Sequence, residues 1–167
     1  MSDLNALVQR HFLYAFNNQA LIKQALTHRS FGADHNEKLE FLGDAILGVV
    51  VAKELYRRFP TAREGELSRL RSTVVSGEAL AKIARFVGLG GYLRLGGGEL
   101  SSGGRDRDSI LADAVEAILG AIFLESGFDA SQVAILSLFN TSIEALSLQD
   151  SKDPKTQLQE LLQAKKQ

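Results

Sequence analysis

The chain has 167 residues, of which 45% are hydrophobic and 23% are charged, and its formal net charge is −1 at pH 7. This length predicts one domain with a real core, the absence of cysteine excludes a disulfide framework and a cysteine-based zinc site, and the charge does not by itself indicate a nucleic-acid-binding protein. We recognise no signal-peptide pattern and no apolar run long enough to span a bilayer, so we expect a cytoplasmic protein with no membrane partner and no small-molecule cofactor.

Taken in chain order, almost every segment is predicted to be helical, because apolar residues recur at three- and four-residue intervals and no strand-like alternation persists. The expected helices cover Leu4–Phe12, Leu21–Leu26, Asn36–Phe59, Thr61–Val74, Ser76–Val87, Ser109–Gly127 and Asp129–Ile143. The expected N-caps are Asn17 or Asn18, Asn36, Ser76 and Asp129. Thr61 and Glu64 are expected to form a Thr-x-x-Glu capping box. The predicted fold class is therefore all-α.

One long segment breaks the helical pattern. Between Gly88 and Gly104 the chain holds eight glycines, at positions 88, 90, 91, 96, 97, 98, 103 and 104. The segment lacks the Gly-Lys-Ser/Thr ending of a phosphate-binding loop. We therefore expect a flexible surface loop that could approach a backbone or a partner closely.

The helix that begins near Asn36 carries an unusual stripe of acids. At 100° per residue, Glu37, Glu40 and Asp44 fall within about 60° of one another, whereas apolar residues cover most of the remaining circumference. Such a helix should be buried. A buried carboxylate is costly, so either its pKa rises or a cation compensates its charge.

A second apolar helix carries a matching pair of acids, Asp113 and Glu116. Gly48 and Gly120 continue the two acidic stripes and are expected to let the two backbones approach closely. Salt bridges are the commoner explanation for one buried acid. However, neither core run contains a nearby Lys or Arg, so four converging carboxylates favour a divalent cation. Ligands that are all oxygen favour Mg²⁺, with Mn²⁺ as a substitute.

Two runs of the sequence together resemble a known family. NEKLEFLGD, from Asn36 to Asp44, and DSILADAVEAILGAIFLESG, from Asp108 to Gly127, closely resemble the ribonuclease III endonuclease domain, and the resemblance extends over essentially the whole chain. The first run is highly specific, whereas the second alone would be weak. Lys38 stands where Arg is usual and Asp108 where Glu is common, and both changes keep the charge. The resemblance implies the ribonuclease III endonuclease-domain helical fold for residues 1–148.

The same resemblance implies a homodimer that hydrolyses phosphodiester bonds of double-stranded RNA by divalent-metal catalysis. The implied products have 5′-phosphate and 3′-hydroxyl ends with short 3′ overhangs, and the expected substrates are structured precursors such as ribosomal RNA. The implied metal ligands are Glu40, Asp44, Asp113 and Glu116. Asp44 and Glu116 among them are the expected catalytic residues.

Several other residues keep two interpretations. Glu37 and Glu64 are possible substrate-proximal residues, because the family's glutamates at these positions lie near the catalytic valley, but helix-dipole stabilisation of Glu37 and the capping box of Glu64 explain them equally well. Phe41 and Leu42 are candidates for a dimer interface or for core packing. The three histidines, His11, His28 and His35, are expected to be structural or surface residues. None follows a Glu by three positions, so the Glu-x-x-His pattern of di-iron bundles is absent.

Residues 149–167 are expected to be a linker and the truncated start of a double-stranded-RNA-binding domain. Asp153 and Pro154 suit a helix start, and DPKTQLQELLQ resembles the opening of that domain, although a simple terminal helix is the alternative. Two other function classes remain open from the sequence. A non-cleaving RNA-binding module of this fold would have lost one of the four acids, and a metal-free interaction protein would use the acids in salt bridges to a partner.

Overall fold

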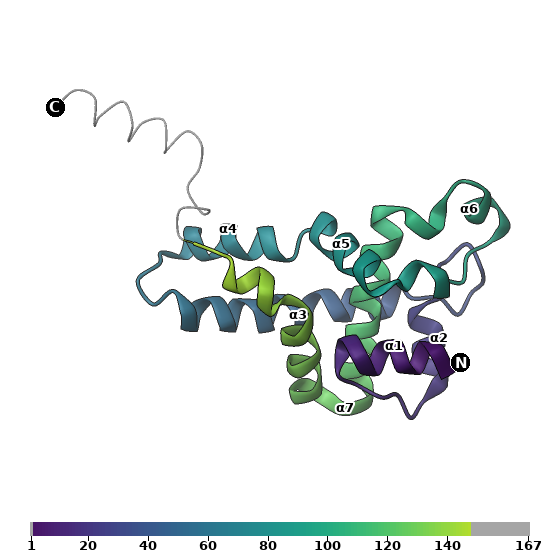
Figure 1. Ribbon diagram of the computed structural model, residues 1–167, viewed down its shortest axis with the longest axis horizontal. Coiled ribbons are helices and arrows are strands. Elements are labelled where there is room, and N and C mark those ends of the chain that lie inside the picture. The colour runs from purple at the N-terminus through teal and green to yellow at the C-terminus, as the bar shows by residue number, and fades with distance from the viewer. Residues whose placement is uncertain (1, 148–167) are drawn as a thin grey trace, which may run out of the picture.

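The computed structural model describes residues 2–147, which fold into α-helices and short 3₁₀ helices without a named β-strand (Figure 1). The elements are α1 (Ser2–Phe12), α2 (Gln19–Ala25), α3 (Glu37–Arg58), α4 (Glu64–Val74), α5 (Gly77–Val87), η1 (Leu89–Tyr92), α6 (Gly97–Ser101), η2 (Gly104–Asp106) and α7 (Asp108–Glu144). The all-α prediction is confirmed. Within this part of the chain, no helix combines the length and apolar character that crossing a membrane requires. The predicted domain boundary near residue 148 and the predicted RNA-binding segment lie outside the described residues.

The fold is organised around the crossing of α3 and α7, against which α1, α2, α4 and α5 pack (Figure 1). At this crossing, a Cβ added to Gly43 would overlap the backbone carbonyl of Glu116, and one added to Gly120 would overlap the backbone carbonyl of Leu39. Glycine at both positions is what allows this backbone approach. The predicted close approach therefore occurs, but Gly43 provides it on α3. The expectation for Gly48 is wrong, because Gly48 faces open space beside α4.

The helix α3 is buried on one side and open on the other. Its core side is formed by Leu39, Leu47, Val50, Val51 and Leu55. On the other side, Phe41, Val49 and Tyr56 expose 79%, 55% and 76% of their surfaces. The prediction that apolar residues all round α3 would bury it is therefore only half right, and an exposed apolar stripe remains.

The two predicted helices near the C-terminal end form one long element, α7, that bends at Gly127. Gly127 has φ 77° and ψ −167°, the non-helical dihedrals within α7, and glycine adopts a positive φ without the steric cost of a Cβ. Asp129 lies inside the second part of α7, so its predicted role as an N-cap is wrong. The apolar residues from Ile110 to Ile122 of the first part supply much of the core.

The first residues of α2, α3, α4 and α5 show which of the other predicted N-caps form. The side chain of Asn18 accepts a hydrogen bond from the backbone N–H of Ala20, and that of Ser76 accepts one from Ala79, as predicted. Asn36 precedes α3 but its side chain makes no capping bond. The predicted Thr61–Glu64 box is wrong, because α4 begins at Glu64 itself.

The capping interaction of α4 lies two residues further on. The backbone N–H of Arg63 donates to the carboxylate of Glu66 at 2.7 Å. The carboxylate of Glu64 instead accepts a hydrogen bond from the hydroxyl of Ser68 at 2.8 Å. Capping therefore does not explain Glu64.

The glycine-rich segment is folded into η1, α6 and η2, so the prediction of an irregular loop is wrong. Three arginines hold it: Arg85 binds Asp106 and Asp108, Arg105 donates to the carbonyls of Gly90 and Gly91, and Arg107 binds Glu99. The predicted close approach to a backbone does occur, because a Cβ at Gly96 would overlap the carbonyl of Ser30. The segment is thereby fixed against the loop that follows α2.

Candidate functional site

Three acidic side chains meet where α3 crosses α7. Glu40 lies in the first turn of α3, while Asp113 and Glu116 lie one turn apart on α7, and each is half-buried. Each side chain offers one carboxylate oxygen to a group in which all three oxygens lie within 4.8 Å of one another. The structure thus brings together three of the four acids that the sequence singled out as metal ligands. We refer to Glu40, Asp113 and Glu116 as the acidic cluster.

The fourth acid, Asp44, lies at the edge of this cluster. It is exposed one turn after Glu40 and lines a groove between α3 and α4, together with Gly48, Ser68 and Arg71. Its carboxylate is not in the three-oxygen group. Its charge nevertheless raises the pKa of Glu116 more than the charge of Glu40 or Asp113 does. Asp44 is therefore an electrostatic neighbour of the cluster.

The acidic cluster has no ion-paired cation, although the charge of Arg29 acts on Glu40 and Asp113 and that of His28 acts on Asp113. Burial, followed by the charges of Asp44, Glu40 and Asp113, raises the pKa of Glu116 to about 8. Burial is also the main reason why the pKa values of Glu40 and Asp113 are raised. Within the described chain, none of the three carboxylates forms an ion pair. Intramolecular salt bridges therefore do not explain these acids.

The donor set fits a hard divalent cation. The cluster consists of carboxylate oxygens alone, which are ligands that Mg²⁺ and Mn²⁺ prefer. Two packed helices hold these ligands. A bound cation would favour the ionised form of each carboxylate, in opposition to the burial and mutual repulsion that raise their pKa values.

A polar pocket of about 460 Å³ opens beside the cluster. Glu40 and Asp113 line it, and so do two acids that are paired with arginines: Glu37 lies 3.2 Å from Arg29, and Glu99 lies 2.7 Å from Arg107. We call this the site pocket. It places Glu37 next to the cluster, where the sequence predicted a substrate-proximal residue.

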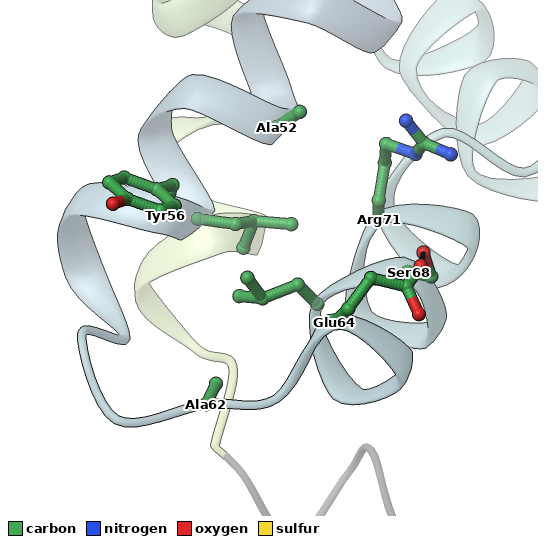
Figure 2. A pocket seen from close by; sticks show the side chains of 8 residues that line it. Ala52, Tyr56, Ala62, Glu64, Ser68 and Arg71 are labelled. Atoms are coloured by element: carbon green, nitrogen blue, oxygen red, sulfur yellow. Dashed lines mark hydrogen bonds between the residues drawn. The ribbon is translucent and has the colours of Figure 1, made fainter.

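Glu64 lies in a different place, at the first turn of α4. Figure 2 shows Glu64, Ser68 and Arg71 on the α4 side of a pocket whose α3 side carries Ala52 and Tyr56. This pocket and the one beside Asp44 share Ala52, Ser68 and Arg71. We call the two adjoining pockets the α3–α4 groove. Within one chain, this groove connects Glu64 with Asp44 and does not bring Glu64 into the cluster.

Sequence reasoning missed two groups of residues at this site. Gly43 shapes the crossing, but nothing in a single sequence distinguishes it from Gly48 without the crossing angle. The site pocket is also lined by four residues from segments far apart in the chain, namely His28, Arg29, Glu99 and Arg107. The contact between the glycine-rich segment and the loop after α2 brings them together, and no local motif predicts that contact.

Comparisons with known proteins agree on one family. A family model described as Ribonuclease-III-like matches residues 18–143. Ribonuclease 3 of Pseudomonas fluorescens (strain SBW25) is 55% identical over 161 residues, which are 96% of this chain and 70% of the relative. Ribonuclease 3 of Vibrio campbellii is 54% identical over 160 residues, which are 95% of this chain and 71% of the relative.

Solved structures give the same result. The nuclease domain of ribonuclease III from Campylobacter jejuni matches with a TM-score of 0.79 and 39% identity, covering 85% of this chain and 97% of that one. A second structure of that domain, at 40% identity and covering 83% of this chain and 97% of its own, concerns structural flexibility in a region involved in dimer formation; its TM-score is 0.79. Dicer from Pichia stipitis matches with a TM-score of 0.62 and 30% identity, covering 79% of this chain and 59% of that one.

Proposed function

The chain belongs to the ribonuclease III family and is a double-stranded-RNA endoribonuclease with the all-α fold of that family's nuclease domain; from this premise we propose that it cuts RNA at the acidic cluster with Mg²⁺, or Mn²⁺ as a substitute, held by Glu40, Asp44, Asp113 and Glu116. The observation that carries the proposal is the group of three carboxylate oxygens within 4.8 Å of one another. The absence of an ion-pair partner for these side chains within the described chain adds support.

The chain's own residues supply a preorganised set of ligands. Glu40, Asp113 and Glu116 project from two helices whose backbones touch at Gly43 and Gly120, so their separation varies little. Asp44 extends the negative surface toward the α3–α4 groove. A divalent cation bound there would supply Lewis acidity toward a phosphate and would lower the pKa of a water molecule. We infer products with 5′-phosphate and 3′-hydroxyl ends and short 3′ overhangs, from structured precursors such as ribosomal RNA in the cytoplasm.

The proposed enzyme is a homodimer that uses the exposed apolar stripe of α3. At 100° per residue, Phe41, Val49 and Tyr56 lie within about 80° of one another on one helix face. Each exposes at least half of its surface, and an exposed apolar surface of this kind favours a protein interface. The α3–α4 groove lies beside the stripe, so a two-fold copy could bury one chain's stripe against the other chain's groove. Core packing does not explain Phe41, whereas Leu42 is half-buried.

Glu37 and Glu64 are proposed to border the path of the RNA. Glu37 lines the site pocket, and Arg29 partly neutralises its charge. Glu64 lines the part of the α3–α4 groove that leads toward Asp44. Their different positions predict different effects. Loss of Glu37 should reduce cleavage in the same subunit, while loss of Glu64 should have a smaller effect than loss of a cluster residue.

A cleavage assay on a perfect RNA duplex tests the function. The chain should cut the duplex with millimolar Mg²⁺ or Mn²⁺ and should be inactive with a chelator. Glu116→Gln should abolish cutting, whereas the same change at Glu64 should leave measurable activity. Products that accept a labelled 5′-phosphate only after phosphatase treatment would support the proposed ends. Equal cutting with chelator, or by Glu116→Gln, would contradict the proposed catalytic centre.

A further inference from the structure

His28 lies at the site pocket, although the sequence predicted a structural or surface residue. It follows α2, is half-buried, and lines the same pocket as Glu40 and Asp113. No ion pair involves His28 among the described residues. Its position next to the proposed ligands raises the question of which ring nitrogen is available to a ligand.

The hydrogen bonds of the loop occupy Nδ1 of His28. The backbone N–H of Ser30 donates to Nδ1 at 3.2 Å, and the hydroxyl of Ser30 lies 2.8 Å from it. That hydroxyl oxygen accepts a hydrogen bond from the backbone N–H of Gly96 at 2.9 Å, so its own proton is available to donate to Nδ1. Because Nδ1 is an acceptor, the neutral ring carries its proton on Nε2.

The loop that carries His28 is held firmly in place. The backbone N–H of His28 donates to the carbonyl of Arg94 at 3.0 Å, and the backbone N–H of Arg94 donates to the carbonyl of Leu26 at 2.8 Å. Gly96 leaves no room for a side chain against Ser30. The glycine-rich segment therefore fixes both the backbone position of His28 and the orientation of its ring.

The two arginines of the site pocket are paired with acids, whereas His28 keeps a donor group that can reach a ligand. Arg29 is paired with Glu37 and Arg107 with Glu99, while Glu40 and Asp113 belong to the acidic cluster. The Nε2–H of His28 has no hydrogen-bond partner among residues 2–147, in contrast to Nδ1. An N–H donor at the edge of a carboxylate cluster suits an oxygen acceptor of the substrate.

We propose that the Nε2–H of His28 donates a hydrogen bond to a backbone oxygen of the RNA strand that enters the site pocket, which makes His28 a substrate-binding residue of the cleavage reaction. This inference rests on the proposed function. A backbone oxygen is the expected acceptor because duplex RNA presents phosphates and 2′-hydroxyls across its shallow groove, where proteins recognise shape. The phosphate and the 2′-hydroxyl share this acceptor chemistry, and the experiment separates them.

The first experiment compares the unmodified chain with His28→Ala, His28→Gln and the control His11→Ala on one RNA duplex. His11 packs edge-on against Phe86 and is absent from the site pocket, so His11→Ala should keep kcat/KM unchanged. His28→Ala should lower kcat/KM by about 10- to 100-fold, the usual effect of losing a hydrogen bond to a charged group. His28→Gln should recover activity to within about fivefold, because its amide N–H can replace the Nε2–H donor.

A second measurement separates a contact with RNA from a structural effect. Single methylphosphonate or 2′-deoxy substitutions are placed in turn at each position around the cut. At the contacted position, the substitution should slow the unmodified chain but should slow His28→Ala little further, since the bond is already lost. A methylphosphonate effect identifies a phosphate acceptor, and a 2′-deoxy effect identifies a hydroxyl acceptor.

The outcomes are distinguishable. If the unmodified chain fails to cut, the proposed function fails. If it cuts and His28→Ala cuts equally well, the inference about His28 is overturned. The inference is also overturned if, at every RNA position tested, the loss of activity from the RNA modification multiplies with the loss from His28→Ala. If His28→Ala melts at a lower temperature or loses Mn²⁺ binding, the deciding comparison is between the unmodified chain and His28→Gln. Recovery with the same dependence on one backbone oxygen would support the proposal, and activity no better than that of His28→Ala would overturn it.

Discussion

Glu40 and Phe41 are neighbours in α3, yet Glu40 is half-buried in the acidic cluster while Phe41 exposes 79% of its surface. Successive residues of a helix point about 100° apart. The helix therefore presents the proposed catalytic ligands on one face and the proposed dimer contact on an adjacent one. Assembly and catalysis can be tested separately by changing these neighbouring residues.

We expect the chain to be a dimer of about twice 18.2 kDa in solution. Phe41→Lys should shift it to a monomer without unfolding it, because the Phe41 side chain is exposed. Light scattering and sedimentation measure the mass. Phe86→Lys is the matched control, since Phe86 is 83% exposed but lies on α5 away from the α3 stripe. A particle of 18.2 kDa for the unmodified chain at micromolar concentration would contradict the prediction.

We expect millimolar Mg²⁺ or Mn²⁺ to raise the Tm of the chain, because a ligand that binds only the native state adds RT ln(1 + [L]/Kd) to its stability. Glu116→Gln should remove most of this increase, as it deletes a carboxylate of the cluster. Glu64→Gln makes the same chemical change outside the cluster and should retain the increase. Calorimetric titration and thermal melting provide the measurements. An unchanged increase in Glu116→Gln would show that the cation binds elsewhere.

Without divalent cations, we expect the cluster to make the folded state less stable as pH rises. Glu116 has a pKa raised from 4.5 to about 8, so between these values the folded state binds more protons than the unfolded state. Its contribution is fully present below the unfolded pKa and is lost as pH rises through about 8. The raised pKa values of Glu40 and Asp113 act in the same direction.

Urea denaturation in a chelator, from about pH 5 to about pH 9, measures this dependence. Glu116→Gln cannot titrate and should show a shallower fall in the free energy of unfolding. Glu54 and Glu125 have lowered pKa values, so their contributions are lost at acidic pH, below this range. Equal slopes for the unmodified chain and Glu116→Gln would rule out Glu116 as the source.

Gly43→Ala should destabilise the fold by about 1 to 3 kcal/mol, the typical cost of overpacking a close contact. A Cβ there would overlap the backbone carbonyl of Glu116. Gly48→Ala is the control on the same helix, where the Cβ would meet open space. It should be neutral or stabilising by about 0.5 to 1 kcal/mol, because Ala favours a helix more than Gly. If denaturation gives Gly43→Ala a free energy of unfolding equal to or greater than that of Gly48→Ala, this account is contradicted.

Helical periodicity predicted much of the site because it concerns residues within one helix. The spacing of Glu40 from Asp44, and of Asp113 from Glu116, correctly placed each pair on one helical face. The position of each pair relative to the other helix depends on where α3 and α7 cross. That crossing is fixed by side chains from both helices, so Gly43 replaced Gly48 as the contact and Asp44 fell at the edge of the cluster.

Long-range contacts account for the other differences from prediction. The glycine-rich segment was expected to be irregular because glycine disfavours helices, but Arg85, Arg105 and Arg107 hold it through hydrogen bonds across intervals of up to 23 residues. His28 belongs to no motif, and its place in the site pocket follows from this folded segment. The capping box of α4 uses Glu66 and not Glu64, because the helix starts after Thr61. Several polar residues in this stretch could have set that boundary.

The contact between Gly43 and Gly120 has a consequence for the choice among cations. Mg²⁺ requires oxygen ligands at about 2.0 to 2.1 Å, whereas Ca²⁺ accepts them at about 2.3 to 2.6 Å with more variable geometry. The spacing of the carboxylates across the cluster follows the distance between the axes of α3 and α7, which these two glycines keep short. A methyl group at this crossing would widen the cluster and favour the larger ion. Discrimination by ionic radius would then depend on two residues that have no side chain with which to bind a metal.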